Sequence, residues 1–364
     1  MSMTIQQHLY DLEEARSMLD PYTRLPEEYV GELRRHALVQ SVHYSTRLEG
    51  NTLTLEQVRD SLAGETVPSP RGQIQEVRNY REAMDYVQSL TTGGTFQITR
   101  DVLRTIHYLV SKSLPGKYAP GQYRSDQNYV VDRTTTRRMF LPPSPGDVSG
   151  LMDELVAWLN RDQEIPVPIK AALAGLNLVA IHPFLDGNGR AARLTDSLAL
   201  YQGGFKAQEL VSLEAYLGRD TLGYYRALAS ALGVRYAPPG DCTVWIEYYL
   251  HAHVEQARVT IREVAEQVRE FDGLAEAFRP ESLSVWQLVA LWVSCRRGHI
   301  SNRAYRSITG RSPQSAVSDF SVLMEKGGLV RVGRGRGVSY VPSDRVLQVY
   351  DAIREEISLG PDSL

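Results

Sequence analysis

The stretch His182-Pro-Phe-Leu-Asp-Gly-Asn-Gly-Arg190, followed by Arg193, decides how this chain is organised. Gly187 and Gly189 let the backbone approach a ligand closely and turn N–H groups toward phosphate oxygens. Apolar residues resume at helical spacing after this loop, so the loop is expected to open a helix whose positive end faces an anion. The stretch therefore predicts a phosphate-binding site at the start of a helix.

The charged side chains of the same stretch suit a magnesium nucleotide. Asp186 is a hard oxygen ligand of the kind that Mg²⁺ takes when it binds together with phosphates. Arg190 and Arg193 lie three residues apart on one face of the helix start, where guanidinium groups can hold phosphates bidentately. His182, with an ordinary pKa of about 6.5, is a candidate general base. The alternative is that the glycines form a simple turn and His182 is an ordinary core residue. We disfavour it because every position of the stretch suits a magnesium nucleotide.

This spacing resembles the signature of the Fic (filamentation-induced) family, H-P-F-x-D/E-G-N-G-R-x-x-R, at every specified position. The resemblance implies an enzyme that transfers AMP from ATP, with Mg²⁺, to a Ser, Thr or Tyr hydroxyl of a protein, itself included. It implies His182 as the base and Asp186 as the metal ligand. The nucleotide contacts that it implies are Phe184, Asp186, Gly187, Asn188, Gly189, Arg190 and Arg193. A phosphate-transferring toxin branch of the family typically has Ala and Lys at the two glycine positions, so this loop argues against that chemistry.

A second motif, Ser45-Thr-Arg-Leu-Glu49-Gly50-Asn51, resembles the inhibitory motif of the family, S/T-x-x-x-E-G/N. Ser45 and Glu49 are four residues apart, so they share one helix face, and Gly50 is a common residue just after a helix end. The resemblance implies that Glu49 pairs with Arg193 and denies that guanidinium to the γ-phosphate of ATP. A second role for Glu49, in hydrolytic removal of AMP, stays open.

The adenine pocket is less well defined by the sequence than the phosphate site. Tyr224 and Tyr225 match a tyrosine pair that helps to line this pocket in the family. Some relatives have Asn seven residues after the second tyrosine, where this chain has Leu232. For Tyr224, filling of the core is an equally good interpretation.

Length and composition indicate an ordinary globular protein of two or three domains. The net charge of −3 over 364 residues argues against a chain that wraps nucleic acid along its whole length. Cys242 and Cys295 lie in no C-x-x-C or Cys/His cluster, so neither a disulfide scaffold nor structural zinc is expected. The first residues lack a signal peptide, and no stretch approaches the ~20 apolar residues of a membrane span. We expect a cytoplasmic protein without a membrane segment, and the family resemblance implies a homodimer.

Helical periodicity dominates the chain and predicts a mostly α fold. We expect an N-terminal helical region with the inhibitory motif over 1–95, a Fic catalytic core over 96–240, a helical linker over 241–281 and a winged helix-turn-helix domain over 282–350. Within the core, two short strands around a Thr-Thr-Thr turn predict a β-hairpin over 127–141. It resembles the flap with which the family aligns a target peptide by strand pairing.

The C-terminal region has a different character. Three predicted helices precede the strand–loop–strand pattern around Gly333-Arg-Gly-Arg336, which is typical of a winged helix. Residues 282–345 hold ten Lys or Arg against three acids, an excess that favours contact with a DNA backbone. Contact with a protein partner is the alternative. A second class of function thus stays open, a nucleotide-sensing, DNA-binding regulator, although a pure sensor would need no base such as His182.

Overall fold

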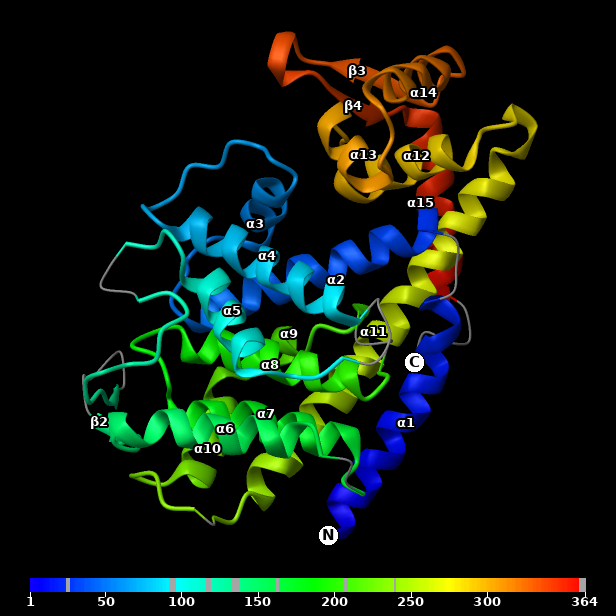
Figure 1. Ribbon diagram of the computed structural model, residues 1–364. Coiled ribbons are helices and arrows are strands. Elements are labelled where there is room, and N and C mark those ends of the chain that lie inside the picture. Colours follow the sequence, from blue (N-terminus) through cyan, green and yellow to red (C-terminus); the bar gives the residue numbers. More distant parts are fainter. Residues whose placement is uncertain are drawn as a thin grey trace. The chain divides into compact units, whose positions relative to one another are not determined.

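The computed structural model describes residues 1–23, 27–91, 96–115, 119–131, 138–161, 164–205, 209–238 and 240–359. They are mostly helical, as the periodicity predicted, with two short antiparallel hairpins (Figure 1). In this part of the chain, no helix is both long enough and apolar enough to cross a membrane.

The backbone divides into two compact units that do not follow the expected order of domains along the chain. The core unit comprises Met1–Asp20, Ala37–Leu62 and Thr66–Arg258. The C-terminal unit comprises Pro21–His36, Ala63–Glu65 and Val259–Leu364. Three helices contribute residues to both units: α2 (Glu27–Leu48), α11 (Thr243–Ala277) and α1 (Met3–Thr23), whose last three residues belong to the C-terminal unit.

The core unit is built from helices with a single hairpin. Besides parts of α2 and α11, its elements are α1 (Met3–Thr23), α3 (Leu55–Leu62), α4 (Gln73–Thr91), α5 (Arg100–Ser111), β1 (Val130–Val131), β2 (Arg138–Phe140), a 3-10 turn (Pro145–Asp147), α6 (Val148–Leu159), α7 (Val167–Ile181), α8 (Asn188–Gln202), α9 (Leu213–Arg219) and α10 (Thr221–Leu232).

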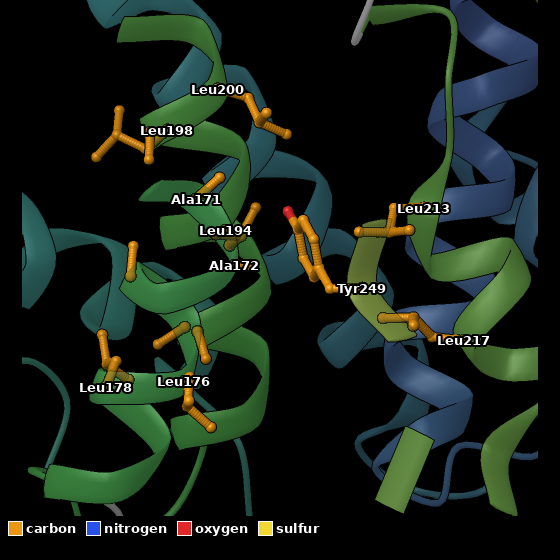
Figure 2. Close-up of a cluster of buried hydrophobic side chains, with 14 of the residues drawn as sticks. Ala171, Ala172, Leu176, Leu178, Leu194, Leu198, Leu200, Leu213, Leu217 and Tyr249 are labelled. Atoms are coloured by element: carbon orange, nitrogen blue, oxygen red, sulfur yellow. The ribbon is translucent and has the colours of Figure 1, made fainter. Parts of the chain in front are cut away.

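Helix α8 lies at the centre of this unit, because α7, α4 and α5 all pack against it. Leu194, Leu198 and Leu200 of α8 are buried beside the alanines and leucines of α7. Figure 2 shows the Tyr249 ring between this group and Leu213 of α9, with its hydroxyl directed toward α7 and α8. The helix that begins at the glycine loop is therefore held on several sides, which fixes its N-terminus.

The predicted hairpin is present but shorter than the sequence suggested. β1 pairs antiparallel with β2, Val130 opposite Phe140, with an irregular register after Val130. The Thr-Thr-Thr turn lies outside the described residues. Just after the hairpin, the N–H of Leu141 donates to the Val234 carbonyl at 3.0 Å, which ties the base of the hairpin to the segment after α10.

The C-terminal unit contains the predicted three helices followed by an antiparallel ribbon. Its elements after α11 are a 3-10 turn (Arg279–Glu281), α12 (Val285–Arg297), α13 (Asn302–Thr309), α14 (Pro313–Glu325), β3 (Leu329–Val332), a 3-10 turn (Gly335–Gly337), β4 (Ser339–Pro342) and α15 (Asp344–Leu359). Leu329 pairs with Pro342 and Val332 with Ser339. The last helix, α15, was not predicted, and Val346 and Tyr350 on it complete the core of this unit.

Candidate active site

His182 follows directly after α7 in a left-handed conformation, with φ 49° and ψ 57°. This conformation is uncommon for a residue with a Cβ, so neighbouring groups must hold it. The imidazole Nδ1 lies 3.3 Å from the Val179 carbonyl oxygen. Since a carbonyl can only accept, Nδ1 carries the proton, and Nε2 keeps its lone pair as the basic nitrogen. Burial lowers the pKa of His182 to about 4, so the ring is neutral at pH 7.

Arg124 holds the histidine turn in place. Its Nε donates to the His182 carbonyl at 2.8 Å, and its Nη2 donates to the Pro143 carbonyl at 2.6 Å. The Arg124 backbone N–H donates to the Pro183 carbonyl at 2.9 Å. The side chain is buried, and burial lowers its pKa. Arg124 thereby joins both flanks of the hairpin to the turn. The sequence contained the Pro120–Arg124 segment beside the predicted flap but gave no sign of this role.

His107 on α5 supports the next part of the loop. Its Nδ1 accepts the Gly121 N–H at 2.9 Å, so its Nε2 is the donor to the Asp186 carbonyl, 2.8 Å away. The ring stacks on Phe184 with centroids 3.6 Å apart. The Phe184 side chain is completely buried, so its ring anchors the loop in the core. Its contact with nucleotide stays a prediction.

The loop ends at the N-terminus of α8, beside Gly187 and Gly189. Gly187 adopts φ 80° and caps the helix. The Asp186 carboxylate is exposed, and its Oδ1 accepts the Gly187 N–H at 2.6 Å. The Asn188 amide closes the loop by accepting the Phe184 N–H at 3.0 Å and donating to the Phe184 carbonyl at 2.9 Å. Asn188 was expected to face the nucleotide, but its side chain is engaged in the loop itself.

Ser45, Glu49 and Arg193 come together in the structure. Arg193 Nε donates to Ser45 Oγ at 2.8 Å, and Nη2 donates to the Ser45 carbonyl at 3.0 Å and to Glu49 Oε1 at 2.9 Å. Although burial lowers the pKa of Arg193, pairing with Glu49 raises it above its ordinary value. A Cβ placed on Gly189 would lie 2.3 Å from Glu49 Oε1. The Glu49 carboxylate therefore occupies the anion-binding position at the start of α8.

Arg190 does not share a ligand with Arg193, contrary to expectation. Its side chain is buried, and Nη1 forms an ion pair with Glu76 of α4. The second oxygen of Glu76 accepts from Asn51 Nδ2 at 3.0 Å. Both arginines of the loop thus pair with carboxylates from the N-terminal helices, and the two arginines face different helices. Glu76 was missed because no local pattern marks a partner that lies 114 residues from Arg190 along the chain.

The two tyrosines of α10 play different parts. Tyr224 is buried against Trp245 with ring centroids 6.1 Å apart, so it fills the core, and its contact with adenine stays a prediction. Tyr225 is 46% exposed, and its hydroxyl donates to the Leu48 carbonyl at 3.1 Å. Tyr225 therefore binds the C-terminal end of the helix that carries Ser45 and Glu49.

Comparison with known proteins places this geometry in a family. The Fic/DOC family model matches residues 97–200. A protein adenylyltransferase Fic from Nematostella vectensis is 36% identical over 175 residues, which cover 47% of this chain and 39% of the relative. A protein of the same name from Culex quinquefasciatus is 33% identical over 178 residues, covering 47% of this chain and 33% of the relative. The chain thus spans less than half the length of these curated relatives.

Solved structures share the fold. A Fic family protein from Desulfovibrio desulfuricans G20 superposes with a TM-score of 0.62 at 23% identity, covering 94% of this chain and 97% of that one. The Fic-1 structure from C. elegans superposes with a TM-score of 0.58 at 23% identity, covering 73% of each chain. The segment that matches the Fic/DOC family model, residues 97–200, contains the histidine turn, the glycine loop and most of α8, so this part of the chain is a Fic/DOC domain.

Proposed function

We propose that this site transfers AMP from ATP to a hydroxyl group of a protein, including its own chain, and that the arrangement described above is its inhibited form. The relatives that match the chain are named protein adenylyltransferases, which supports this class of reaction. The observation that carries the proposal is a neutral imidazole, His182, beside a helix N-terminus that already holds a carboxylate. An anion-binding position next to a proton acceptor suits attack by a hydroxyl on a phosphate.

The reaction would proceed by displacement at the α-phosphorus. The oxygen of the target hydroxyl forms a bond to the α-phosphorus, and the bond from that phosphorus to the oxygen bridging the α- and β-phosphates breaks. Pyrophosphate leaves, and the hydroxyl proton passes to Nε2 of His182. The N–H groups at the start of α8 would stabilise the negative charge, and Arg193 would hold the γ-phosphate once Glu49 withdraws.

Asp186 fits the magnesium ion that such a reaction needs. It is an exposed carboxylate at the entrance of the phosphate position, and Mg²⁺ accepts one or two carboxylates when phosphate oxygens complete its coordination. When bound, the ion would neutralise charge on the phosphates. Asn188 and Phe184 are assigned to loop closure and anchoring, because their polar and apolar atoms are engaged there.

Autoinhibition by Glu49 is the part of the proposal that is most directly testable. Glu49→Gly removes the carboxylate that occupies the phosphate position, so AMP incorporation from α-³²P-ATP should rise at least tenfold, the equivalent of one charge-assisted hydrogen bond. Arg193→Ala in the same background should lose this gain, because the γ-phosphate then has no guanidinium. Equal incorporation by the parent and Glu49→Gly would contradict the inhibitory role. Release of AMP from a labelled target by the parent, and not by Glu49→Gly, would assign Glu49 the second, hydrolytic role as well.

A second candidate function, DNA contact, is supported by the exposed face of the ribbon and α14. Gln314 and Ser318 on α14 are exposed, and Arg331 and Arg334 are exposed on the ribbon. Polar side chains on a helix with arginines beside it suit a major groove and its phosphates. Arg331→Ala with Arg334→Ala should weaken binding to a duplex and flatten its salt dependence. No binding of the parent to random-sequence duplex at 50 mM salt would exclude this function.

Two further expectations remain proposals, a homodimer from the family resemblance and a cytoplasmic location from the sequence. If the protein is a homodimer, light scattering at micromolar concentration should give twice the mass of the chain. A mass equal to that of one chain would exclude the homodimer. Residence in the cytoplasm predicts that a tagged chain fractionates with other cytoplasmic proteins.

A further inference from the structure

We propose that α9 holds the inhibitory helix α2 against the core, with Glu214 as the hydrogen-bonding anchor and Gly218 as the close contact. This inference rests on the proposed function, because α2 carries Ser45 and Glu49 follows directly after its last residue. It adds positioning residues that touch neither the nucleotide position nor Arg193.

The first observation is a polar stripe along α2. Ser41, Ser45 and Glu49 follow one another at intervals of four residues, so they lie on one face of the helix. Ser45 and Glu49 bind Arg193, but Ser41 Oγ donates to Glu214 Oε2 at 2.9 Å. The stripe therefore has a separate attachment point one turn before the motif.

The second observation is the environment of Glu214, which is buried at the start of α9. Three hydroxyl groups donate to it: Ser41 at 2.9 Å, Tyr80 at 3.0 Å and Ser212 at 3.4 Å. Burial and the nearby Glu214 raise the pKa of Tyr80 well above its ordinary value, so Tyr80 remains a neutral donor. A buried carboxylate is costly unless its hydrogen bonds are made. Of these donors, only Ser41 comes from α2, so Glu214 favours the docked position of that helix.

The third observation is the steric fit one turn along α9. A Cβ on Gly218 would lie 2.4 Å from Tyr44 Cδ1 and 3.0 Å from Tyr44 Cβ, so α2 and α9 touch where α9 has no side chain. Leu213 and Leu217 of α9 belong to the core cluster on the side of Tyr249 (Figure 2). Glu214 and Gly218 form the neighbouring face. α9 thus packs into the core with one face and receives α2 with the other.

Loss of either contact should favour an undocked α2, in which water solvates Glu214 and Glu49 leaves Arg193 more often. We therefore expect Ser41→Ala to raise AMP incorporation roughly tenfold or more, the effect of losing one hydrogen bond to a charged group. The matched control is Ser61→Ala on α3, since Ser61 is also a buried helical serine and its hydroxyl has no hydrogen-bond partner among the described residues. That control should leave incorporation unchanged.

Gly218→Ala tests the same contact by a different route, because it adds a methyl group and removes no hydrogen bond. The clash with Tyr44 should displace α2 and raise incorporation by a similar factor. Gly150→Ala on α6 is its control, because a Cβ there meets no atom within 4 Å.

A double variant separates positioning from a general loss of stability. If α9 acts only by placing α2, Ser41→Ala in the Glu49→Gly background should add nothing to incorporation, because the inhibitory carboxylate is already absent. Full additivity of the two changes would overturn the inference, as would unchanged incorporation by both Ser41→Ala and Gly218→Ala while Glu49→Gly is activated.

Hydrogen exchange of the full chain provides a readout that does not depend on the reaction. Amides of residues 41–49 should exchange faster in Ser41→Ala and Gly218→Ala than in Ser61→Ala and Gly150→Ala. Equal protection in all four variants would overturn the inference. If exchange changes as expected but even Glu49→Gly incorporates no AMP, then the proposed reaction is wrong while the docking role of α9 stands.

Discussion

At the scale of single residues, His182 is subject to two opposing demands. Burial lowers its pKa to about 4, which keeps the imidazole neutral and able to accept a proton at pH 7. A general base works best when its pKa lies near the working pH, so a value of about 4 makes a weak acceptor. Bound phosphates would add negative charge nearby and raise this pKa. We infer that nucleotide binding itself strengthens the base.

The role of His182 predicts a specific loss of chemistry. His182→Ala in the Glu49→Gly background should lower AMP incorporation by roughly 10²–10⁴ because proton transfer is lost. Affinity for ATP, measured by calorimetry, should stay nearly the same, since the imidazole is not part of the phosphate-binding helix start. Incorporation equal to that of the Glu49→Gly parent would show that another group takes the proton.

Arg124 predicts a coupled loss of stability and activity. Arg124→Lys leaves one ammonium group in place of a planar fork, so the carbonyls of His182 and Pro143 cannot both be satisfied. Each unsatisfied buried carbonyl costs about 1–3 kcal/mol, so the melting temperature and AMP incorporation should both fall. Arg226→Lys, at an exposed position on α10, is the control. If the two substitutions have equal effects, Arg124 does not hold the turn.

At the scale of elements, the end of α2 depends on a residue from α10. Tyr225→Phe keeps the ring but removes the donor to the Leu48 carbonyl, so the last turn of α2 should fray. Incorporation should rise roughly two- to tenfold, less than in Glu49→Gly, since a neutral hydrogen bond contributes about 0.5–1.5 kcal/mol. Lower incorporation, with weaker ATP binding, would assign Tyr225 to the nucleotide site.

Elements with local signals could be predicted from the sequence. Threonine is a common N-cap residue, and α3 begins directly after Thr54, with Gln57 N–H donating to Thr54 Oγ1 at 3.2 Å. The glycines around Asn188 predicted the loop that opens α8. By contrast, the Glu76–Arg190 pair and the hydrogen bonds from Ser41 and Tyr80 to Glu214 join residues that are far apart in the chain. Such contacts follow from how helices pack, and helical periodicity does not encode which helices meet.

At the scale of the whole molecule, the excess of basic residues over 282–345 was a poor guide to the surface charge of the C-terminal unit. Arg296 pairs with Glu270, Arg297 with Glu32 and Arg345 with Glu281. Each of these acids lies outside the counted region, in α11, α2 or the turn after α11. The sequence count therefore overstates the charge that the C-terminal unit presents to a partner. Only the fold shows that residues 21–36 belong to this unit.

Stability of the core unit should fall in mild acid because of His253. Burial lowers the pKa of His253 to about 4 in the folded chain, against about 6.5 when unfolded. The unfolded chain therefore binds the extra proton first, and stability is lost as pH falls from 6.5 to 4, on the order of 3 kcal/mol for this residue. Denaturation at several pH values should show a shallower loss for His253→Gln. Parallel curves for the two proteins would rule out this contribution.

The space above Gly189 has a consequence for how such a chain can evolve. A Cβ at this position would lie 2.3 Å from Glu49 Oε1, so the Glu49 carboxylate would have to move away. The same side chain would also exclude an incoming phosphate, because both anions need the start of α8. A point mutation at Gly189 would therefore affect the binding of the Glu49 carboxylate and the binding of the proposed phosphate alike. Selection for a permanently active form should therefore leave the loop unchanged. It should instead change α2 and the residues that hold α2, because only the Glu49 carboxylate depends on them.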